Sequence, residues 1–512
     1  MRGRTLPLYG LVFMAGLVSL GVELAASRLL DPWFGNSILV WASLIGLILL
    51  YLSLGYWLGG RIADRRPRAT VLYTLLAFAA LGVAAIPLVA RPVLRLAAGA
   101  FVTLDAAILA GSFSATLVLF SLPVILLGCT GPFAIRLLVR DPAQAGRVSG
   151  RVFALSTLGS ILGVFLTVLI LIPNLGVRRT FFTLGLTLAA PAILLLLPLH
   201  RRRGLLLALL WVLFFLLALL PSGFIHPEQA TLYERESAYN YIQVVANGPE
   251  VVLKLNEGAG VHSVYRPGME LADGIWDYFL LAPFFAPAPV AAKDVDSLLM
   301  IGLAAGTVPK LYTHIFGPIP IDGVELDPAV IEVGRAYFAM NEPNLNAIAE
   351  DGRYYLNHEA GRYDVIAIDA YRPPYIPFHL TTVEFYTEVR DHLTENGVVA
   401  VNAARTATDF ALVDALAATL AQVFPSVYII DEPTAGADLG NSLIVATKQA
   451  GTLEDYRRNT ARLEHPLLQE MVRRAENHVR VAASGGVVLW DDRAPVEQIV
   501  HGIVLRYMLG IP

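Results

Sequence analysis

The stretch Ser297–Glu325, SLLMIGLAAGTVPKLYTHIFGPIPIDGVE, decides the fold of the second half of the chain. Its apolar run Ser297–Ile301 predicts a buried strand, and the small residues of Gly302–Gly306 predict a tight turn that leads into a helix from about Val308. A second strand, Ile321–Glu325, follows and ends in an acid. Two strands joined through a helix lie parallel in one sheet, so this stretch predicts an α/β fold.

The pattern extends on both sides of this stretch. Downstream, Tyr363–Asp369 and Gly397–Asn402 are further candidates for buried strands. Upstream, Tyr241–Ala246 and Glu250–Leu255 flank Asn247-Gly248, which is a strong signal for a hairpin turn. We therefore predict a parallel, doubly wound sheet preceded by a β-hairpin, with its ligand at the carboxyl ends of the strands.

The first half of the chain differs sharply in composition. The whole chain is 56% hydrophobic and 16% charged, and its mean hydropathy is +0.59. No lysine occurs from Leu6 to Leu220, whereas all four lysines and nine of the ten histidines follow Pro221. Because the composition changes there, we predict a helical bundle over residues 1–221 and an α/β domain over residues 222–512.

The apolar half predicts a multi-pass protein of the plasma membrane, with the lipid bilayer as its surroundings. A helix crosses a bilayer with about 20 apolar residues. Seven runs are long enough: 8–30, 38–60, 70–90, 114–138, 152–173, 179–198 and 204–221. The stretch 93–112 is a weaker, eighth candidate, because Arg95 and Asp105 interrupt it. Gly159 and Gly163 form a small-xxx-small pattern that predicts close helix packing.

The ionisable residues of the first span, the single cysteine and the net charge restrict the classes of function that the chain can have. Glu23 and Arg28 lie within the first span, where an ionisable group marks either a structural ion pair or a transport or ligand site. Cys129 is the single cysteine, which excludes an internal disulfide and a cysteine metal cluster. The net charge of −4 lacks the basic footprint of a nucleic-acid-binding protein.

Acids and glycines gather where the predicted strands end. Gly302 and Gly306 allow a ligand to approach the backbone, and Glu325 ends the next strand, where an acid can accept both ribose hydroxyls of a nucleoside. A plain turn and a helix-capping acid explain each feature equally well when taken alone. Asp351-Gly352 and Asp369 fall on the same edge. This layout suits NAD and S-adenosyl donors, and the order of elements with the N-terminal hairpin favours the S-adenosyl donor.

Several motifs together resemble the spermidine synthase (polyamine aminopropyltransferase) family, in its membrane-fused bacterial branch. The resemblance covers about Glu234 to Asn402. It rests on Glu236-Ser-Ala-Tyr-Asn-Tyr-Ile242, Gly302–Gly306, Val324-Glu-Leu-Asp-Pro328, Asp351-Gly352, Asp369-Ala-Tyr and the terminal Leu489–Glu497. It implies a class I methyltransferase-like sheet, a homodimer, and transfer of an aminopropyl group from decarboxylated S-adenosylmethionine to a polyamine or other amine.

The resemblance also implies roles for single residues. Asn240, Glu325, Asp351 and Gly352 would hold the nucleoside, together with Gly302 and Gly306 of the turn. Asp369 would be the base that deprotonates the attacking amine. No metal is needed, because a sulfonium is already an activated leaving group.

The positions that grip the diamine in the family are altered. Arg372 replaces an acid, Ala305 replaces another, and Trp276-Asp277 replaces a segment with a histidine. These changes weaken binding of a dication, although Asp273, Asp277 and Tyr278 are candidates to bind the substrate instead. Two other functions remain open: an S-adenosylmethionine-dependent methyltransferase with a membrane-borne or hydrophobic acceptor, and a transporter or sensor with a nucleoside- or polyamine-binding domain.

Two arguments predict opposite sides of the membrane for the α/β domain. With seven spans, the arginine-rich loops share the side of the N-terminus, and the positive-inside rule makes that side cytoplasmic. The α/β domain would then lie outside. Donors of this kind are made in the cytoplasm, however, so an active domain should face it, and we predict the cytoplasmic face.

Overall fold

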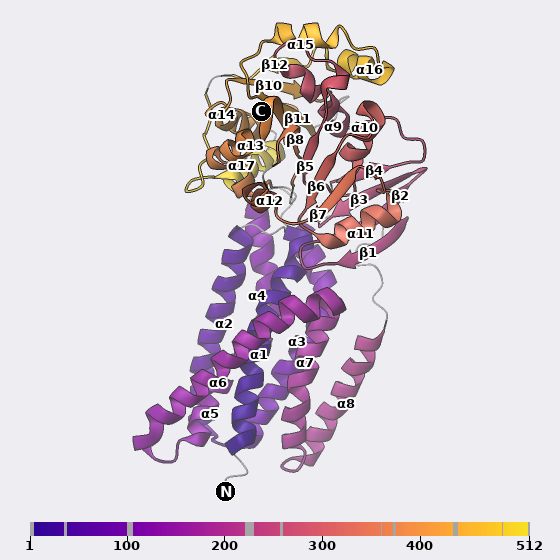
Figure 1. The fold of residues 1–512 in the computed structure, drawn as a ribbon. Helices are drawn as coiled ribbons and strands as arrows, with labels where there is room; N and C mark the ends of the chain where they lie inside the picture. The colour runs from indigo at the N-terminus through magenta and orange to yellow at the C-terminus, as the bar shows by residue number, and fades with distance from the viewer. Residues whose placement is uncertain are drawn as a thin grey trace. The chain divides into compact units, whose positions relative to one another are not determined.

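The structure is a computed structural model, and its chain forms two compact units (Figure 1). It describes residues 5–34, 38–99, 106–220, 230–256, 260–359, 361–371, 375–433, 439–483 and 485–509. The first unit comprises Met1–Pro227 with Arg235–Ala238, and the second comprises Glu228–Glu234 with Tyr239–Pro512.

The first unit is mainly helical in its described residues. Its elements are α1 (Thr5–Phe34), α2 (Ile38–Arg65), α3 (Ala69–Gly99), α4 (Ala106–Gly128), α5 (Thr130–Leu138), α6 (Ala145–Leu166), a π-helical turn (Thr167–Leu171), α7 (Ile172–Leu196) and α8 (Arg201–Leu219). Six helical runs are long and apolar enough to cross a membrane. The prediction of seven differs because 152–173 and 179–198 fall in one run of 55 residues, Pro142–Leu196, which Gly176 interrupts with φ 73°.

The weak candidate span 93–112 is not a helix of its own. Its described residues are the end of α3 and the beginning of α4, and residues 100–105, with Asp105, lie outside the described part. Of the two ionisable residues noted in the first span, Arg28 lies 3.7 Å from Asp31 on the same helix and forms an ion pair there.

Small residues bring the helices of this unit together. A Cβ atom on Gly159 would lie 2.0 Å from the carbonyl oxygen of Phe13, and one on Gly163 would lie 2.1 Å from that of Leu17. Helix α6 therefore packs backbone to backbone on α1, as the small-xxx-small pattern predicts. Gly55 brings α2 equally close to α4, since its Cβ would lie 2.3 Å from the Ile125 carbonyl oxygen.

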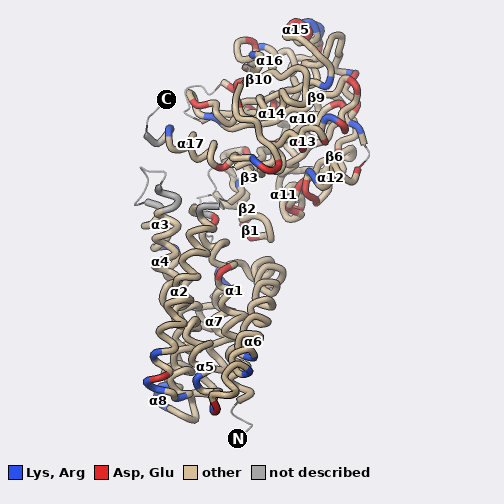
Figure 2. The backbone as a smooth tube through the Cα atoms, turned by 90° about the vertical axis from the view of Figure 1, so that its left-hand side faces the viewer, with Lys and Arg blue, Asp and Glu red and all other residues tan. Residues whose placement is uncertain are grey.

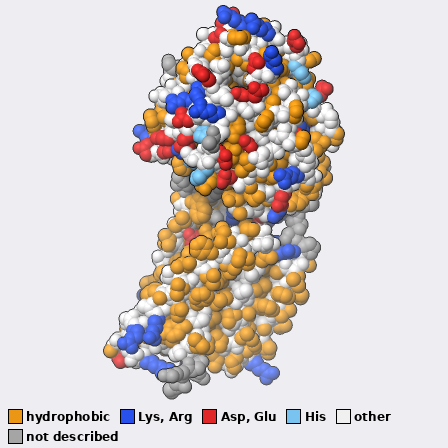
Figure 3. Space-filling model, in the orientation of Figure 1, with side chains coloured by type: hydrophobic (Ala, Val, Ile, Leu, Met, Phe, Trp, Pro, Cys, Tyr) orange, Lys and Arg blue, Asp and Glu red, His pale blue; other side chains and the backbone are white. Residues whose placement is uncertain are grey.

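The outer surface of this unit is largely apolar, and its arginines concentrate at one end. Side chains such as Trp57 and Leu209 are exposed by more than half, and apolar side chains cover the flank seen in Figure 3. Most blue segments of the unit lie at the end where the N-terminus is found (Figure 2). Asp64 and Arg136, 3.1 Å apart, join the end of α2 to α5 there. An apolar band with a charged end is the surface that a membrane-spanning bundle needs.

The second unit is built on an eight-stranded mixed sheet with the order β12-β10-β11-β9-β8-β5-β6-β7. The strands are β5 (Leu298–Ile301), β6 (Ile321–Glu325), β7 (Leu345–Ala349), β8 (Tyr363–Ile368), β9 (Leu393–Thr406), β10 (Ser426–Asp431), β11 (Leu439–Thr447) and β12 (Val479–Val481). The prediction of an all-parallel sheet is wrong at one end. Strand β11 lies antiparallel between β9 and β10, because the connection 432–438 is too short for the crossover that a parallel pair needs.

Both faces of the sheet are buried. Met300 and Ala367 belong to one apolar core, and Ile301 and Ile368 belong to the other. Alternate residues of a strand point to opposite faces, so a strand covered on both sides reads as a continuous apolar run. The covering helices are α10 (Thr307–Phe316), α11 (Pro328–Tyr337), α12 (Gly352–His358), α13 (Val383–Asp391), α14 (Ala411–Leu420), α15 (Leu453–Thr460), α16 (Pro466–Ala475) and α17 (Val496–Leu509).

A small antiparallel sheet precedes this fold, with the order β1-β2-β3-β4. Its strands are β1 (Thr231–Glu236), β2 (Tyr241–Asn247), β3 (Glu250–Leu255) and β4 (Ser263–Tyr265). The predicted hairpin is confirmed, since Asn247 pairs with Glu250 and Gly248 has φ 62°. The outer strands β1 and β4 were not predicted.

Candidate active site

The turn after β5 lies against the end of β8. Gly302 and Gly306 both have φ 87°, a backbone conformation that favours glycine. A Cβ atom on Gly302 would lie 2.4 Å from the carbonyl oxygen of Asp369. The amide of Asp369 donates to the carbonyl of Ile301 at 2.9 Å. The predicted glycine turn and the predicted base therefore share the carboxyl edge of two neighbouring strands.

Glu325 ends β6 and is bonded to the same turn. Its Oε2 accepts the amide of Ala304 at 2.9 Å, and its Oε1 accepts the amide of Asp327 at 3.1 Å. Burial raises the pKa of Glu325 to about 7, against the opposing effect of these amide hydrogen bonds. The turn and the acid, each ambiguous alone in the sequence, form one hydrogen-bonded unit.

Asn240 reaches the end of β6 from the small sheet. Its Nδ2 donates to Asp327 at 3.0 Å, and its Oδ1 accepts from Asn256 at 3.1 Å. The other carboxylate oxygen of Asp327 accepts the amide of Ala329 and caps α11. Asn240 is thus bonded to Asp327, which lies two residues beyond Glu325 along the chain.

Asp351 and Gly352 lie at the beginning of α12. Asp351 Oδ1 accepts the amides of Arg353 and Tyr354, both at 3.0 Å, while Oδ2 lies 3.0 Å from His379 Nε2. The hydrogen bond from His379 lowers the pKa of Asp351 most, against the effect of burial. A Cβ atom on Gly352 would lie 2.4 Å from Ile301 Cγ2, which places this pair beside the end of β5.

Asp369 follows β8 and receives two side-chain hydrogen bonds. Asn402 Nδ2 donates to its Oδ1 at 2.9 Å, and the side chain of Trp276 also bonds to the carboxylate. Burial raises the pKa of Asp369 to about 6, although both hydrogen bonds oppose the shift. Asn402 Oδ1 is buried and has no hydrogen-bond partner in the described part of the chain. The sequence did not point to Trp276 or Asn402 as partners of this carboxylate.

The two acids predicted to bind the substrate, Asp273 and Asp277, already bind groups of the protein itself. Asp277 is fully buried and accepts the amides of Ala272 (2.7 Å) and Asp273 (2.8 Å), and burial raises its pKa to about 6. Asp273 forms ion pairs with Arg266 at 2.7 Å and Arg474 at 3.2 Å. Two arginines thus offset the charge of Asp273, and Asp277 holds the turn that precedes Trp276.

The remaining predicted positions fall as follows. Tyr278 is buried, which raises its pKa to about 12. Ala305 is buried, and its amide donates to Ser263 Oγ at 3.0 Å. Arg372 lies outside the described residues. Across the described ranges, no group of three or more histidine, cysteine or acidic side chains is arranged to hold a metal.

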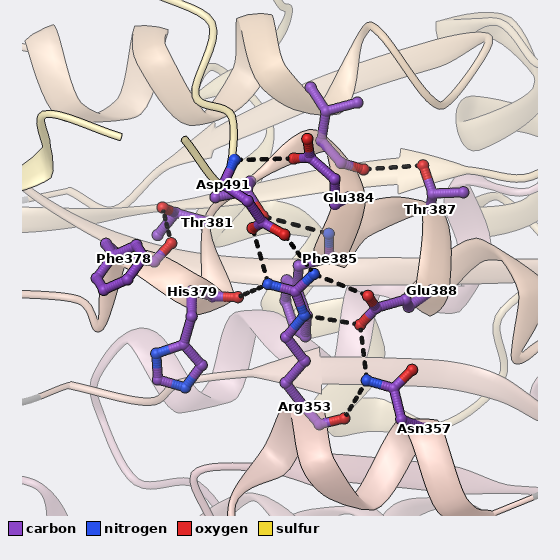
Figure 4. Close-up of polar contacts among 12 residues, drawn as sticks. Arg353, Asn357, Phe378, His379, Thr381, Glu384, Phe385, Thr387, Glu388 and Asp491 are labelled. Carbon is purple, nitrogen blue, oxygen red and sulfur yellow. Dashed lines mark hydrogen bonds and ion pairs between the residues drawn. The ribbon is translucent and has the colours of Figure 1, made fainter. Parts of the chain in front are cut away.

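A cluster of hydrogen bonds around Arg353, here called the arginine clamp, fixes the C-terminal motif to α12 and α13 (Figure 4). Arg353 donates to both oxygens of Glu388 at 2.9 and 2.8 Å and to both oxygens of Asp491 at 2.8 Å. Thr382 donates to Asp491 at 2.6 Å. Paired, planar hydrogen bonds of this kind are strong and directional. Asp491 belongs to the terminal motif, so the clamp gives that motif a structural role.

Comparison with known proteins finds a family match within the second unit. Residues 305–453 match the family described as "Spermine/spermidine synthase domain". Over these residues the C-terminal domain is similar to the spermidine synthase family. Its apolar N-terminal extension fits a branch in which such a region is fused to the domain.

Several relatives are named as polyamine aminopropyltransferases. A "Probable polyamine aminopropyl transferase" of Bifidobacterium longum is 30% identical over 299 residues, which cover 55% of this chain and 65% of the relative. The chain thus spans just under two thirds of that relative. "Polyamine aminopropyltransferase 2" of Ralstonia nicotianae is 25% identical over 415 residues, or 77% of both chains. Because that match is longer than the second unit, it extends into the apolar half.

Among solved structures, a "probable spermidine synthase" from Corynebacterium glutamicum is similar to this chain with a TM-score of 0.38 and 19% identity. The match covers 51% of this chain and 98% of that protein.

Proposed function

We propose that the chain is a membrane-bound aminopropyltransferase that transfers an aminopropyl group from decarboxylated S-adenosylmethionine to an amine. The observation that carries this proposal is Asp369, a half-buried carboxylate with a pKa raised to about 6 at the same sheet edge as the glycine turn. A base with a pKa near the working pH transfers protons most efficiently. A pure sensor would have no need for such a group.

The reaction follows from the chemistry of a sulfonium donor. The lone pair of the acceptor amine attacks the aminopropyl carbon bonded to sulfur, a C–N bond forms, and the C–S bond breaks. Sulfur keeps the electron pair and leaves as methylthioadenosine. The amine loses one proton, which Asp369 accepts. An ammonium has no free lone pair, so this carboxylate must orient the nucleophile and remove its proton.

The nucleoside would lie along the turn, between Glu325 and Asp351. Glu325 stands at the strand end where an acid accepts ribose hydroxyls. Asn240 lies next to it through Asp327. Beside the end of β5, next to Gly352, Asp351 presents a carboxylate whose pKa is held low, so it stays an acceptor at neutral pH.

The acceptor site is less acidic than a diamine site needs. Asp273 is paired with two arginines, and Asp277 spends both oxygens on backbone amides. We therefore propose an amine acceptor other than putrescine, bound with help from Tyr278 and Trp276. A methylated acceptor would arise instead if the donor were S-adenosylmethionine, because the fold serves both donors.

Product analysis separates the alternatives. The purified full chain in detergent is incubated with isotopically labelled decarboxylated S-adenosylmethionine or S-adenosylmethionine, together with a mixture of amines. Mass spectrometry then finds an aminopropylated amine with methylthioadenosine, a methylated product with S-adenosylhomocysteine, or neither. The last result would refute an enzymatic role and favour a sensor or transporter.

A further inference from the structure

The carboxylate of Asp351 is fixed from two directions. Two backbone amides occupy its Oδ1, and His379 Nε2 lies 3.0 Å from its Oδ2. A carboxylate oxygen accepts up to two hydrogen bonds, so Oδ2 can take one more donor beside His379. Both side chains are 35% exposed, so a ligand can reach this oxygen.

His379 is itself held by the arginine clamp. Its carbonyl oxygen accepts Arg353 Nη1 at 3.2 Å, and the same guanidinium binds Glu388 and Asp491. The imidazole ring points away from this guanidinium (Figure 4). The ring therefore stays free to contact Asp351, while its backbone is anchored to α12, α13 and the C-terminal motif.

The charges around the pair leave Asp351 as an anionic acceptor. The acids around this pair come from three elements. They are Asp351 at the beginning of α12, Glu388 of α13 and Asp491 of the C-terminal segment. Arg353 bonds to Glu388 and Asp491 and neutralises them. From its own turn, the ring of His379 meets only the apolar edge of Phe378 among the described ring contacts. An anionic acceptor favours an amino group and repels a carbonyl oxygen.

We propose that His379 is a positioning residue that makes Asp351 distinguish a 6-amino purine from a 6-oxo purine. This inference rests on the proposed nucleoside site. By holding Oδ2 in one orientation, His379 directs the open lone pair toward the exocyclic N–H of the base. Without His379 the carboxylate can rotate, and its preference for the amino group falls.

The test is calorimetric binding of methylthioadenosine and methylthioinosine to the full chain in detergent. His379→Ala should weaken binding of methylthioadenosine about tenfold, which is the effect of losing one charge-assisted hydrogen bond. Binding of methylthioinosine should change by less than about threefold, because that base gains nothing from an oriented acceptor. His379→Gln keeps an N–H donor and should retain the preference for the amino base.

His358→Ala is the matched control, because His358 lies on α12, stacks on Tyr354 and bonds to its carbonyl without contacting Asp351. It should leave both affinities unchanged. If His379→Ala does not fold, His379→Asn takes its place, since the shorter amide does not reach Oδ2. Equal losses for both nucleosides, or no loss, would overturn the inference. Failure of the wild type to bind either nucleoside would instead overturn the proposed function.

Discussion

The carboxylate of Glu325 accepts the backbone amide of Ala304 at 2.9 Å. This bond joins the acid at the end of β6 to the glycine turn after β5, so the two features predicted to bind a nucleoside depend on each other. Any change at Glu325 should disturb the turn as well as the ribose contact, whereas a change at a surface acid should disturb neither.

Glu325→Ala should abolish stabilisation by methylthioadenosine. At a ligand concentration of about one hundred times the dissociation constant, the wild type should gain roughly 5–10 °C in melting temperature. The variant should gain almost nothing, because it lacks the ribose acceptor and the support of the turn. Glu464→Ala, at an exposed position outside the site, should behave as the wild type. Failure of methylthioadenosine to stabilise the wild type would refute the nucleoside site.

The pH dependence of catalysis should follow Asp369. Its base form is needed, so kcat/KM should rise about tenfold per pH unit below about pH 6 and level off above it. Asn402 donates to this carboxylate and lowers its pKa, so Asn402→Ala should move the acidic limb to higher pH. A profile unchanged in Asn402→Ala would show that another group is titrating.

The same shift has a consequence for stability. The pKa of Asp369 is raised above the usual 3.8, so the folded state favours the neutral carboxyl. That contribution should be complete below about pH 4 and be lost as the pH rises through about 6. In Asp369→Asn the corresponding slope of the unfolding free energy with pH should be smaller between these values, as measured by denaturant titration at each pH.

Parts of this site could be predicted from the sequence and parts could not. Glu325, Asp351 and Asp369 each stand at or just after a strand end in a βα pattern, so their common edge follows from parallel pairing. Trp276, Asn402 and His379 come from distant segments, and no local pattern shows which side chain they meet. The direction of β11 was missed because a strand buried on both faces has the same apolar run either way.

Putrescine should be a poor acceptor. Asp273 forms ion pairs with two arginines, and Asp277 accepts backbone amides, so these acids leave little negative charge for a second ammonium group. With decarboxylated S-adenosylmethionine in excess, kcat/KM for putrescine should be well below that for the best acceptor found in an amine screen. Efficient spermidine formation at micromolar putrescine would contradict this and would assign the missing charge to residues near Tyr278.

The α/β domain should lie on the cytoplasmic side of the membrane, because its donor is made in the cytoplasm. The arginines at the ends of α2 and α8 favour the opposite orientation when the run Pro142–Leu196 crosses twice. Reporter fusions after Pro512 decide between them. We expect the fluorescent-protein fusion to be fluorescent and the alkaline phosphatase fusion to be inactive. An active alkaline phosphatase would place the domain outside the cytoplasm, where its donor is not made.

The most direct test of the account is release of methylthioadenosine from decarboxylated S-adenosylmethionine by the full chain, measured with and without an amine mixture. The wild type should release it only when an amine is present, in equal amount to the aminopropylated product. Asp369→Asn should lower the rate about 100- to 10,000-fold while binding the donor as before. Amine-dependent release at the wild-type rate in Asp369→Asn, or no release from the wild type with any amine, would contradict the proposed reaction.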